Sequence, residues 1–376
     1  MLDAPYFLQL MIGPGVPIPV PREVLDALVS VEVTSNTESA SVFQLTFTLS
    51  TRSPLHTLFL VAGGAGIPMI RVVIIVVTRG GTEVLMDGVM THHQVSGGDA
   101  GGHATLTITG EDLSKVMTYL PFDGLPYPAM PPNIRVLTIL AKYAVLGIVP
   151  LVIPPLIMDI ALPTEQIDRQ NGNDLDYIRC LADGVGYEFY VDPGPLPLQS
   201  TAYWGPSIRV GAPQPALNIN MDSETNVESM DFKFDPEEPV LPVVMIYPKM
   251  LKVGIPIPIP AVNPLAPPMG LVPPIPKKVE IDRESARKNP GVALLAAFSR
   301  AARTADAAQV TGTLNVARYG RILKSRRTVG VRGAGLAFDG LYYVRSVKHS
   351  IQRGEYKQDF TLVRNGLIST LPRVPA

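Results

Sequence analysis

Polar and apolar residues alternate along residues 338–367 in a pattern typical of a β-hairpin. Antiparallel pairing keeps the sum of paired residue numbers constant, so a two-residue turn at Arg353-Gly354 fixes the register. Three pairs then share a mainly apolar face and three share a polar face: Ile351 with Tyr356, Val347 with Phe360, Arg345 with Leu362, Ser350 with Lys357, Lys348 with Asp359, and Ser346 with Thr361. A slip by one residue would mix the faces. We expect Lys348 and Asp359 to form a surface ion pair worth at most ~1 kcal/mol.

A fainter copy of this stretch lies upstream, at residues 87–113. Its features follow the same order, with glycines at the turn: Asp87-Gly88-Val89 matches Asp339-Gly340-Leu341, His93 matches His349, and Thr105-Leu106 matches Thr361-Leu362. Recurrence in a fixed order indicates an internal duplication. The alternative is that two hairpins resemble each other by chance.

Several other segments have the periodicity of strands. Residues 43–49 alternate apolar and polar, as a half-buried strand does, whereas residues 70–77 are continuously apolar and β-branched, which predicts burial on both faces. Residues 228–235 alternate again. Residues 6–22 are rich in proline, which removes backbone donors, and we expect an extended arm there.

Three segments have the pattern of helices. Asn133 is expected to cap a helix that reaches Gly147, and Asn173 to cap one from Asp174 to Asp183. An alanine-rich helix follows at residues 290–308. Cys180 lies inside the second helix, where we expect it to be a small core residue. Two proline-rich segments lie between these elements: we expect residues 121–132 to form a linker and residues 255–276 to be polyproline-like and extended.

These elements predict a mainly β protein with α/β insertions. Residues 1–118 form a first small β-barrel, residues 119–227 an inserted α+β domain, and residues 228–376 a second β unit. A proline-rich segment and a helix at about 250–308 interrupt the second unit.

Composition indicates a component of an assembly. Only 17% of the 376 residues are charged and the net charge is −1, so much apolar surface is expected to become interface. A near-zero net charge argues against nucleic acid as a partner. The apolar stretches 55–77 and 144–158 are broken by glycine, proline or arginine, so we expect no stable membrane insertion. A single cysteine excludes an intrachain disulfide.

No motif points to catalysis. The chain has no nucleophile elbow, phosphate-binding loop or dinucleotide fingerprint. His92, His93 and His103 could converge across the upstream hairpin, but no cysteine or clear carboxylate accompanies them. We therefore expect no enzyme activity, no metal and no cofactor. A basic run from Arg318 to Arg327 is expected to be a local patch or a solvated strand edge.

Several segments together resemble the hub family of contractile tails, which includes phage late-control protein D, baseplate hub proteins and the N-terminal part of VgrG. They occur in family order at residues 87–89, 107–114, 172–190, 202–206, 225–232 and 339–351. Each segment is weak alone, whereas the ordered set is fairly specific.

The resemblance implies two homologous tail-tube-like barrels per chain and a homotrimer in which six barrels form a pseudo-sixfold ring. Such a ring joins a sixfold inner tube to a threefold spike. This sequence shows no OB-fold or β-helical needle, so we expect a separate spike protein. Other expected partners are inner tube proteins and neighbouring baseplate proteins, which the proline-rich segments could contact. The N-terminus lacks the features of a secretory signal, so assembly is expected in the bacterial cytoplasm, as part of a phage tail or injection particle.

Two other functions stay open: a cell-surface or cell-wall binding module of a tail, and a hydrolase with a cryptic site around the three histidines. For a hub, we expect interfaces at the strand edges of the two hairpins, because a ring must cover its sheet edges. The candidate interface residues are Val89, Thr91, Tyr342 and Val344.

Overall fold

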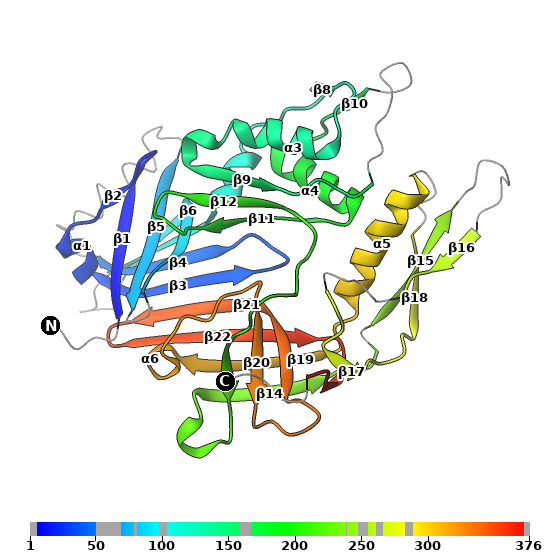
Figure 1. The fold of residues 1–376 in the computed structure, drawn as a ribbon. Coiled ribbons are helices and arrows are strands. Elements are labelled where there is room, and N and C mark those ends of the chain that lie inside the picture. The colour runs from blue at the N-terminus through cyan, green and yellow to red at the C-terminus, as the bar shows by residue number, and fades with distance from the viewer. Residues whose placement is uncertain are drawn as a thin grey trace.

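The protein is described by a computed structural model that covers residues 6–49, 69–78, 81–97, 104–157, 167–237, 239–246, 255–260, 266–282 and 289–371. One large sheet dominates it (Figure 1). Its first seven strands are β1 (Tyr6–Pro14), β2 (Ile18–Pro19), β3 (Leu28–Asn36), β4 (Val42–Leu49), β5 (Ile70–Thr78), β6 (Gly81–Ser96) and β7 (Ala104–Asp112). The others are β13 (Gln214–Asn218), β14 (Val227–Phe234), β19 (Ala308–Asn315), β20 (Thr328–Arg332), β21 (Gly340–Gln352) and β22 (Glu355–Arg364).

The two β units within this sheet have the same strand order. The first runs β3-β4-β7-β6-β5-β1 and the second β14-β19-β22-β21-β20-β13. If the six strands of each unit are numbered in chain order, their spatial order across the sheet is 2-3-6-5-4-1 in both units. One difference is that β13 pairs parallel with β20, whereas β1 pairs antiparallel with β5. The prediction of two separate barrels is not confirmed: both units belong to one large sheet, and the described strands form no closed barrel.

Burial follows the predicted alternation. In β4, Phe43, Leu45 and Phe47 are at most 2% exposed, and the polar residues between them are half-exposed. β5 is buried on both faces from Ile70 to Val76, as its β-branched apolar residues predict, and Arg71 within it is buried as well. One hydrophobic core extends beneath both units.

The closing hairpin has the predicted turn and most of the predicted register. The pairs at Ile351, Ser350, Lys348, Val347 and Ser346 all form. The pair of Arg345 with Leu362 is wrong: a β-bulge at Arg345 places Val344 opposite Leu362. The bulge frees the Arg345 backbone to accept a hydrogen bond of 3.1 Å from the Thr37 amide on the first unit.

The N-terminal segment is not a free arm. β1 pairs with β5 over nine residues, and its prolines fall at or beyond the end of the strand. The helix α1 (Arg22–Asp26) follows. After β7, Asp112 accepts a hydrogen bond from the Ser114 amide and caps the 3-10 turn η2 (Leu113–Thr118).

The inserted domain packs two helices against a small sheet. Its helices are α3 (Pro132–Ala141) and α4 (Asp174–Val185), and its strands are β9 (Ile148–Val152), β11 (Glu188–Pro193) and β12 (Ser200–Gly205), with the short pair β8 (Pro126–Tyr127) and β10 (Asp168–Arg169) beside them. Asn173 caps α4 as predicted. Asn133 is not a cap, because the prolines before it start α3 earlier. Cys180 is exposed, so the prediction of a core position is wrong.

A lobe on the right of Figure 1 interrupts the second unit. The helix α5 (Pro290–Thr304) packs on a sheet of β15 (Val240–Ile246), β16 (Ile255–Pro258) and β18 (Lys278–Asp282). Part of the predicted polyproline segment is therefore a sheet strand. The remaining short elements are η3 (Ala144–Leu146), η4 (Asp222–Glu224), β17 (Gly270–Val272), α6 (Val316–Tyr319) and β23 (Leu367–Ser369).

Candidate functional site

The feature that organises the chain is the junction where its three parts meet. β21 leaves β20 after residue 343 and pairs antiparallel with β3 from Ser346 to Gln352. The strand that opens the closing hairpin therefore joins the second unit to the first. Position in sequence gives no hint of this contact, because more than 300 residues separate the two strands.

Arg326 connects all three parts. Its Nη1 donates to Asp192 Oδ1 of the inserted domain at 2.8 Å, and its Nη2 donates to the Asn36 carbonyl of the first unit at 2.5 Å. Its guanidinium lies 4.0 Å from the centre of the Tyr190 ring. Arg326 belongs to the basic run that was expected to be a local patch or a solvated strand edge, yet its side chain is only 8% exposed. Lys324 of the same run contacts Glu83 Oε2 at 2.6 Å.

A buried ion pair fixes the first hairpin to the inserted domain. Arg71 on β5 donates two hydrogen bonds of 2.7 Å to Asp87 on β6, and both side chains are almost fully buried. Ser200 of β12 donates to the same carboxylate at 3.2 Å, and Arg71 also donates to the Leu198 carbonyl. Asp87 is the acidic residue of the first Asp-Gly motif, which was the signal for this site. Its arginine partner gave no signal in the sequence.

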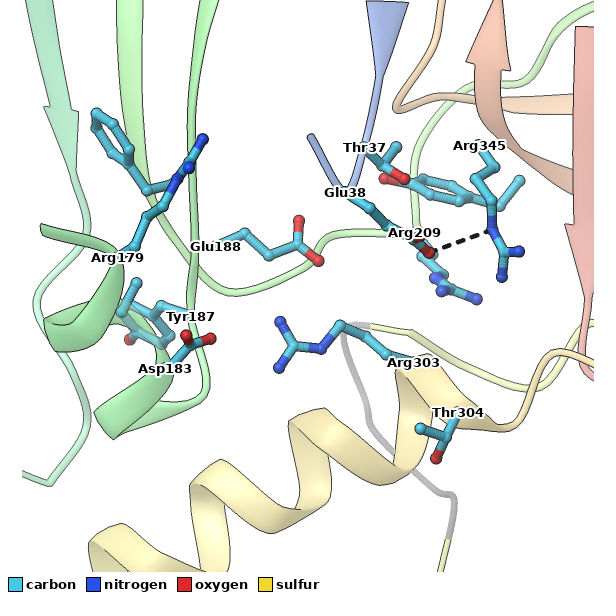
Figure 2. A pocket seen from close by; sticks show the side chains of 13 residues that line it. Thr37, Glu38, Arg179, Asp183, Tyr187, Glu188, Arg209, Arg303, Thr304 and Arg345 are labelled. Carbon is cyan, nitrogen blue, oxygen red and sulfur yellow. Dashed lines mark ion pairs between the residues drawn. The ribbon is translucent and has the colours of Figure 1, made fainter. Parts of the chain in front are cut away.

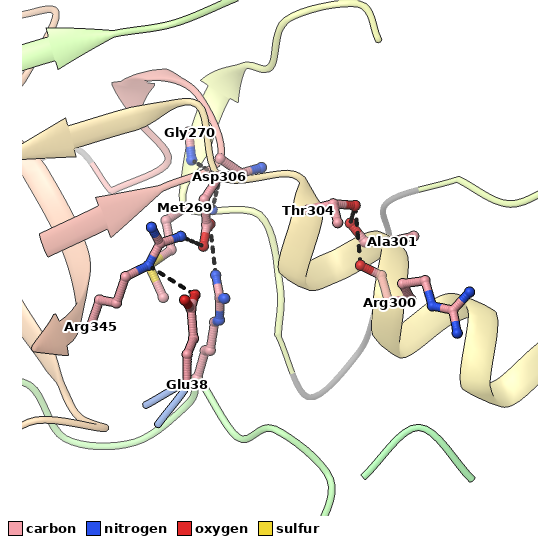
Figure 3. A network of polar contacts seen from close by, with 10 residues as sticks. Glu38, Met269, Gly270, Arg300, Ala301, Thr304, Asp306 and Arg345 are labelled. Atoms are coloured by element: carbon pink, nitrogen blue, oxygen red, sulfur yellow. Dashed lines mark hydrogen bonds and ion pairs between the residues drawn. The ribbon is translucent and has the colours of Figure 1, made fainter. Parts of the chain in front are cut away.

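A cavity of about 420 Å³ opens between the inserted domain, α5 and the large sheet (Figure 2). Charged side chains line it: Glu38, Arg179, Asp183, Glu188, Arg209, Arg303 and Arg345. Arg209 donates to the buried Asp306 at 2.7 Å, and Arg345 lies 3.5 Å from Glu38 and 3.6 Å from Asp306 (Figure 3). Burial lowers the pKa of Arg209, but the Asp306 carboxylate outweighs it and raises that pKa above its usual value.

A second cavity, of about 380 Å³, reaches the buried His349. Burial lowers the pKa of His349 to about 4, so the ring is neutral near pH 7. Its Nδ1 lies 2.8 Å from the Tyr356 hydroxyl. Gln358 beside it bonds both the amide and the carbonyl of Leu323. These contacts join β21, β22 and the Leu323 backbone within the chain.

The predicted interface residues occupy different surroundings. Val89, Tyr342 and Val344 are fully buried in their own chain. Thr91 is half-exposed and forms a β-bulge, with its Oγ1 donating to the Thr109 carbonyl at 3.2 Å. The three buried side chains do not reach the surface, so contact with another chain stays a prediction for Thr91 and the backbone around it.

The histidine cluster does not assemble in the part of the chain that the structure describes. His92 and His93 are exposed neighbours on β6, and their side chains point to opposite faces of the strand. His103 lies outside the described residues. No group of three potential metal ligands forms among the residues described.

The predicted ion pair between Lys348 and Asp359 is wrong, because each of these residues contacts a different partner. Lys348 and Asp359 lie opposite each other, but Lys348 contacts Glu32 on β3 at 3.0 Å, and Asp359 accepts from Thr313 at 2.7 Å. Pairing of β21 with β3 places Glu32 beside Lys348, which the hairpin alone did not show. Among the described residues, no helix has the length and apolar character needed to cross a bilayer.

No protein-family model matches this sequence, and no curated protein is similar to it in sequence. Solved structures are similar in fold. A tail protein from Neisseria meningitidis aligns with a TM-score of 0.63 at 14% identity, covering 96% of this chain and 98% of that one. The 43 kDa tail protein of prophage MuSo2 from Shewanella oneidensis gives 0.62 at 12% identity, with coverage of 96% and 98%.

A third similar structure is a component of the type VI secretion system of E. coli, described as structurally similar to the phage T4 tail proteins gp27 and gp5. It gives a TM-score of 0.53 at 13% identity, covering 93% of this chain and 78% of that chain. The chain thus has the fold of phage tail and type VI secretion proteins. At the level of the fold, this confirms the resemblance to the hub family of contractile tails.

Proposed function

We propose that this chain is a structural baseplate hub subunit of a phage-like contractile injection system. Three copies form a ring that joins a sixfold inner tube to a threefold spike carried by a separate chain. The role is structural and not enzymatic. The observation that carries the proposal is the fold: tail proteins align with nearly the whole of this chain, and nearly the whole of each of those chains aligns in return.

The two units support the symmetry part of the proposal. Each chain contributes two β units with the same strand order, joined within one sheet by the pairing of β21 with β3. Three such chains offer six similar units around a threefold axis, which is the arrangement that a threefold-to-sixfold adaptor requires. The buried Arg71–Asp87 pair and Arg326 hold the inserted domain against both units, so the chain can act as one rigid block.

Native mass spectrometry of the purified protein tests the ring. The expected result is a species of three chains, at low micromolar concentration, that binds a tube protein at one end and a spike protein at the other. A chain that stays monomeric even with tube and spike proteins present would contradict the proposal. Retention of the protein on purified cell walls would favour the alternative, a wall-binding module.

A further inference from the structure

The pairing of β21 with β3 has an equivalent pair of strands that are not paired with each other within one chain. Within the chain, β21 pairs with β20 through its first residues and then with β3 from Ser346 to Gln352. In the shared strand order, β6 takes the place of β21, and β14 takes the place of β3. The pair that corresponds to β21 and β3 is therefore β6 and β14, which do not touch within the chain.

Two pairs of equivalent β-bulges allow the two units to be aligned residue by residue. β6 is bulged at Thr91 and β21 at Arg345, in both cases on the first strand of the hairpin. β3 is bulged at Val29 and β14 at Glu228, both next to the strand that follows. If the two hairpin bulges are aligned, His92 is equivalent to Ser346. Carrying this alignment across the paired strands to β3 and β14 makes Asp231 equivalent to Glu32. The same alignment makes Glu228 equivalent to Val29, so the second pair of bulges supports it independently.

Among the described strands, neither counterpart edge has a partner. β5 pairs with β6 only as far as Val89, so beyond the bulge the second edge of β6 has no partner among the described strands. Residues His92 to Ser96 are exposed there, and Val95 is 46% exposed. β14 ends the sheet and pairs with β19 alone in the described part. Free edges of this kind are templates for pairing with another strand.

We propose that β6 of one copy pairs antiparallel with β14 of the next copy, repeating between copies the contact that β21 makes with β3 within each copy. The occupant of each free edge is a second copy of this chain, which makes the inference rest on the proposed ring. Because the two edges differ, the contact is head-to-tail and generates a closed ring when the rotation matches.

The alignment also gives the register between β6 of one copy and β14 of the next, and in this register the opposed side chains are chemically complementary. On one face it sets His92 opposite Asp235, Gln94 opposite Lys233, and Ser96 opposite Asp231. On the other face it sets His93 opposite Phe234 and Val95 opposite Phe232. The exposed Val95 would meet an apolar ring, and His92 would meet a carboxylate. A shift by one residue would set Val95 against Lys233 or Asp231.

Disulfide trapping tests this register. In a Cys180→Ser background, Gln94→Cys and Lys233→Cys are combined in one chain, because directly opposed residues in antiparallel strands lie within disulfide range. The matched control combines Gln94→Cys with Ser229→Cys, which lies on the same face of β14, about 13 Å further along the strand. The single-cysteine variants complete the set. Each protein is oxidised, and its native mass and non-reducing gel pattern are recorded.

The expected result is a set of covalent dimers and trimers for the Gln94/Lys233 variant alone, with the control showing at least a tenfold lower yield. A native trimer whose matched pair gives no interchain disulfide would overturn this pairing and leave the proposed ring standing. Covalent ladders beyond three chains would support the pairing and overturn the trimer. Monomers in every sample would overturn both.

Discussion

The two hairpins have the same place in their units, yet they hold their buried polar groups in opposite ways. In the first hairpin, Asp87 of β6 forms a buried ion pair with Arg71 of the neighbouring strand β5, and a serine of the inserted domain also donates to its carboxylate. β21 and β22 bury the neutral groups His349, Tyr356 and Gln358. At the position equivalent to Gln358, the first hairpin has Leu106, which is also fully buried. One backbone arrangement thus accepts either ionic or neutral polar contacts, and each set attaches its hairpin to a different neighbour.

The largest effect on the free energy of unfolding is expected from breaking the buried ion pair between Arg71 and Asp87. Asp87→Ala leaves the Arg71 guanidinium buried without its carboxylate, which should lower the free energy of unfolding by about 3–5 kcal/mol. Urea denaturation followed by tryptophan fluorescence measures it, since Trp204 lies in the inserted domain. The double variant Arg71→Met with Asp87→Leu should recover much of the loss. Equal destabilisation of the single and double variants would show that the buried charge is not the cause.

The neutral side of the comparison predicts a dependence on pH. The pKa of His349 is about 4 in the folded chain, against about 6.5 when unfolded, so the unfolded chain binds more protons between these values. Stability from this residue is complete above pH 6.5 and falls as the pH drops toward 4, by on the order of 3 kcal/mol. Unfolding measured across this range should show a flatter slope for His349→Gln. An unchanged slope in His349→Gln would mean that this ring is not the source of the pH dependence.

A third variant places the residue of one hairpin in the other. Gln358→Leu gives the second hairpin the side chain found at Leu106, but it leaves the amide and carbonyl of Leu323 without their partner. We expect a loss of about 1–3 kcal/mol in thermal or urea unfolding. The control Leu106→Ile changes the equivalent position of the first hairpin without removing a polar group and should lose at most about 1.5 kcal/mol. A neutral Gln358→Leu would mean that the two hairpins are interchangeable at this position.

The smallest effect is expected on the surface of the junction. Lys348 and Glu32 are both about 40% exposed, so Lys348→Ala should change the free energy of unfolding by no more than about 1 kcal/mol. Raising the salt concentration should shrink this difference further. A double-mutant cycle with Glu32→Ala isolates the pair. A coupling well above about 1 kcal/mol would mean that the β3–β21 contact depends on this ion pair more than on its backbone hydrogen bonds.

Local pattern was enough to predict much of each hairpin. The two-residue turn and the alternation of faces gave the register of the closing hairpin on the turn side of Arg345. Beyond that residue the bulge shifts the pairing, and no residue type in the sequence marks it. In the structure, Thr37 and Glu38 of the other unit contact Arg345 at this point. The match of residue types between the two hairpins differs by two to four residues from the match given by strand pairing, which makes Asp87 equivalent to Leu341 and Thr105 equivalent to Lys357.

The junction could not be predicted from local sequence. Its parts come from strands near opposite ends of the chain, and periodicity carries no information about which strands meet. Arg326 stood in a basic run that is typical of a solvated surface, yet it is 8% exposed and joins three parts. Asp87 was singled out by its motif, but its arginine partner lay within a continuous apolar run. The fold resemblance succeeded because it drew on ordered segments across the chain.

The pairing of β3 with β21 also sets an order of events during synthesis. β3 is complete within the first forty residues, but the strand that covers its edge ends at Gln352. Until that late strand arrives, β3 offers the kind of open edge that another chain could bind. A nascent or truncated chain that lacks β21 therefore lacks the finished sheet, and the two units are joined only when nearly the whole chain has been synthesised.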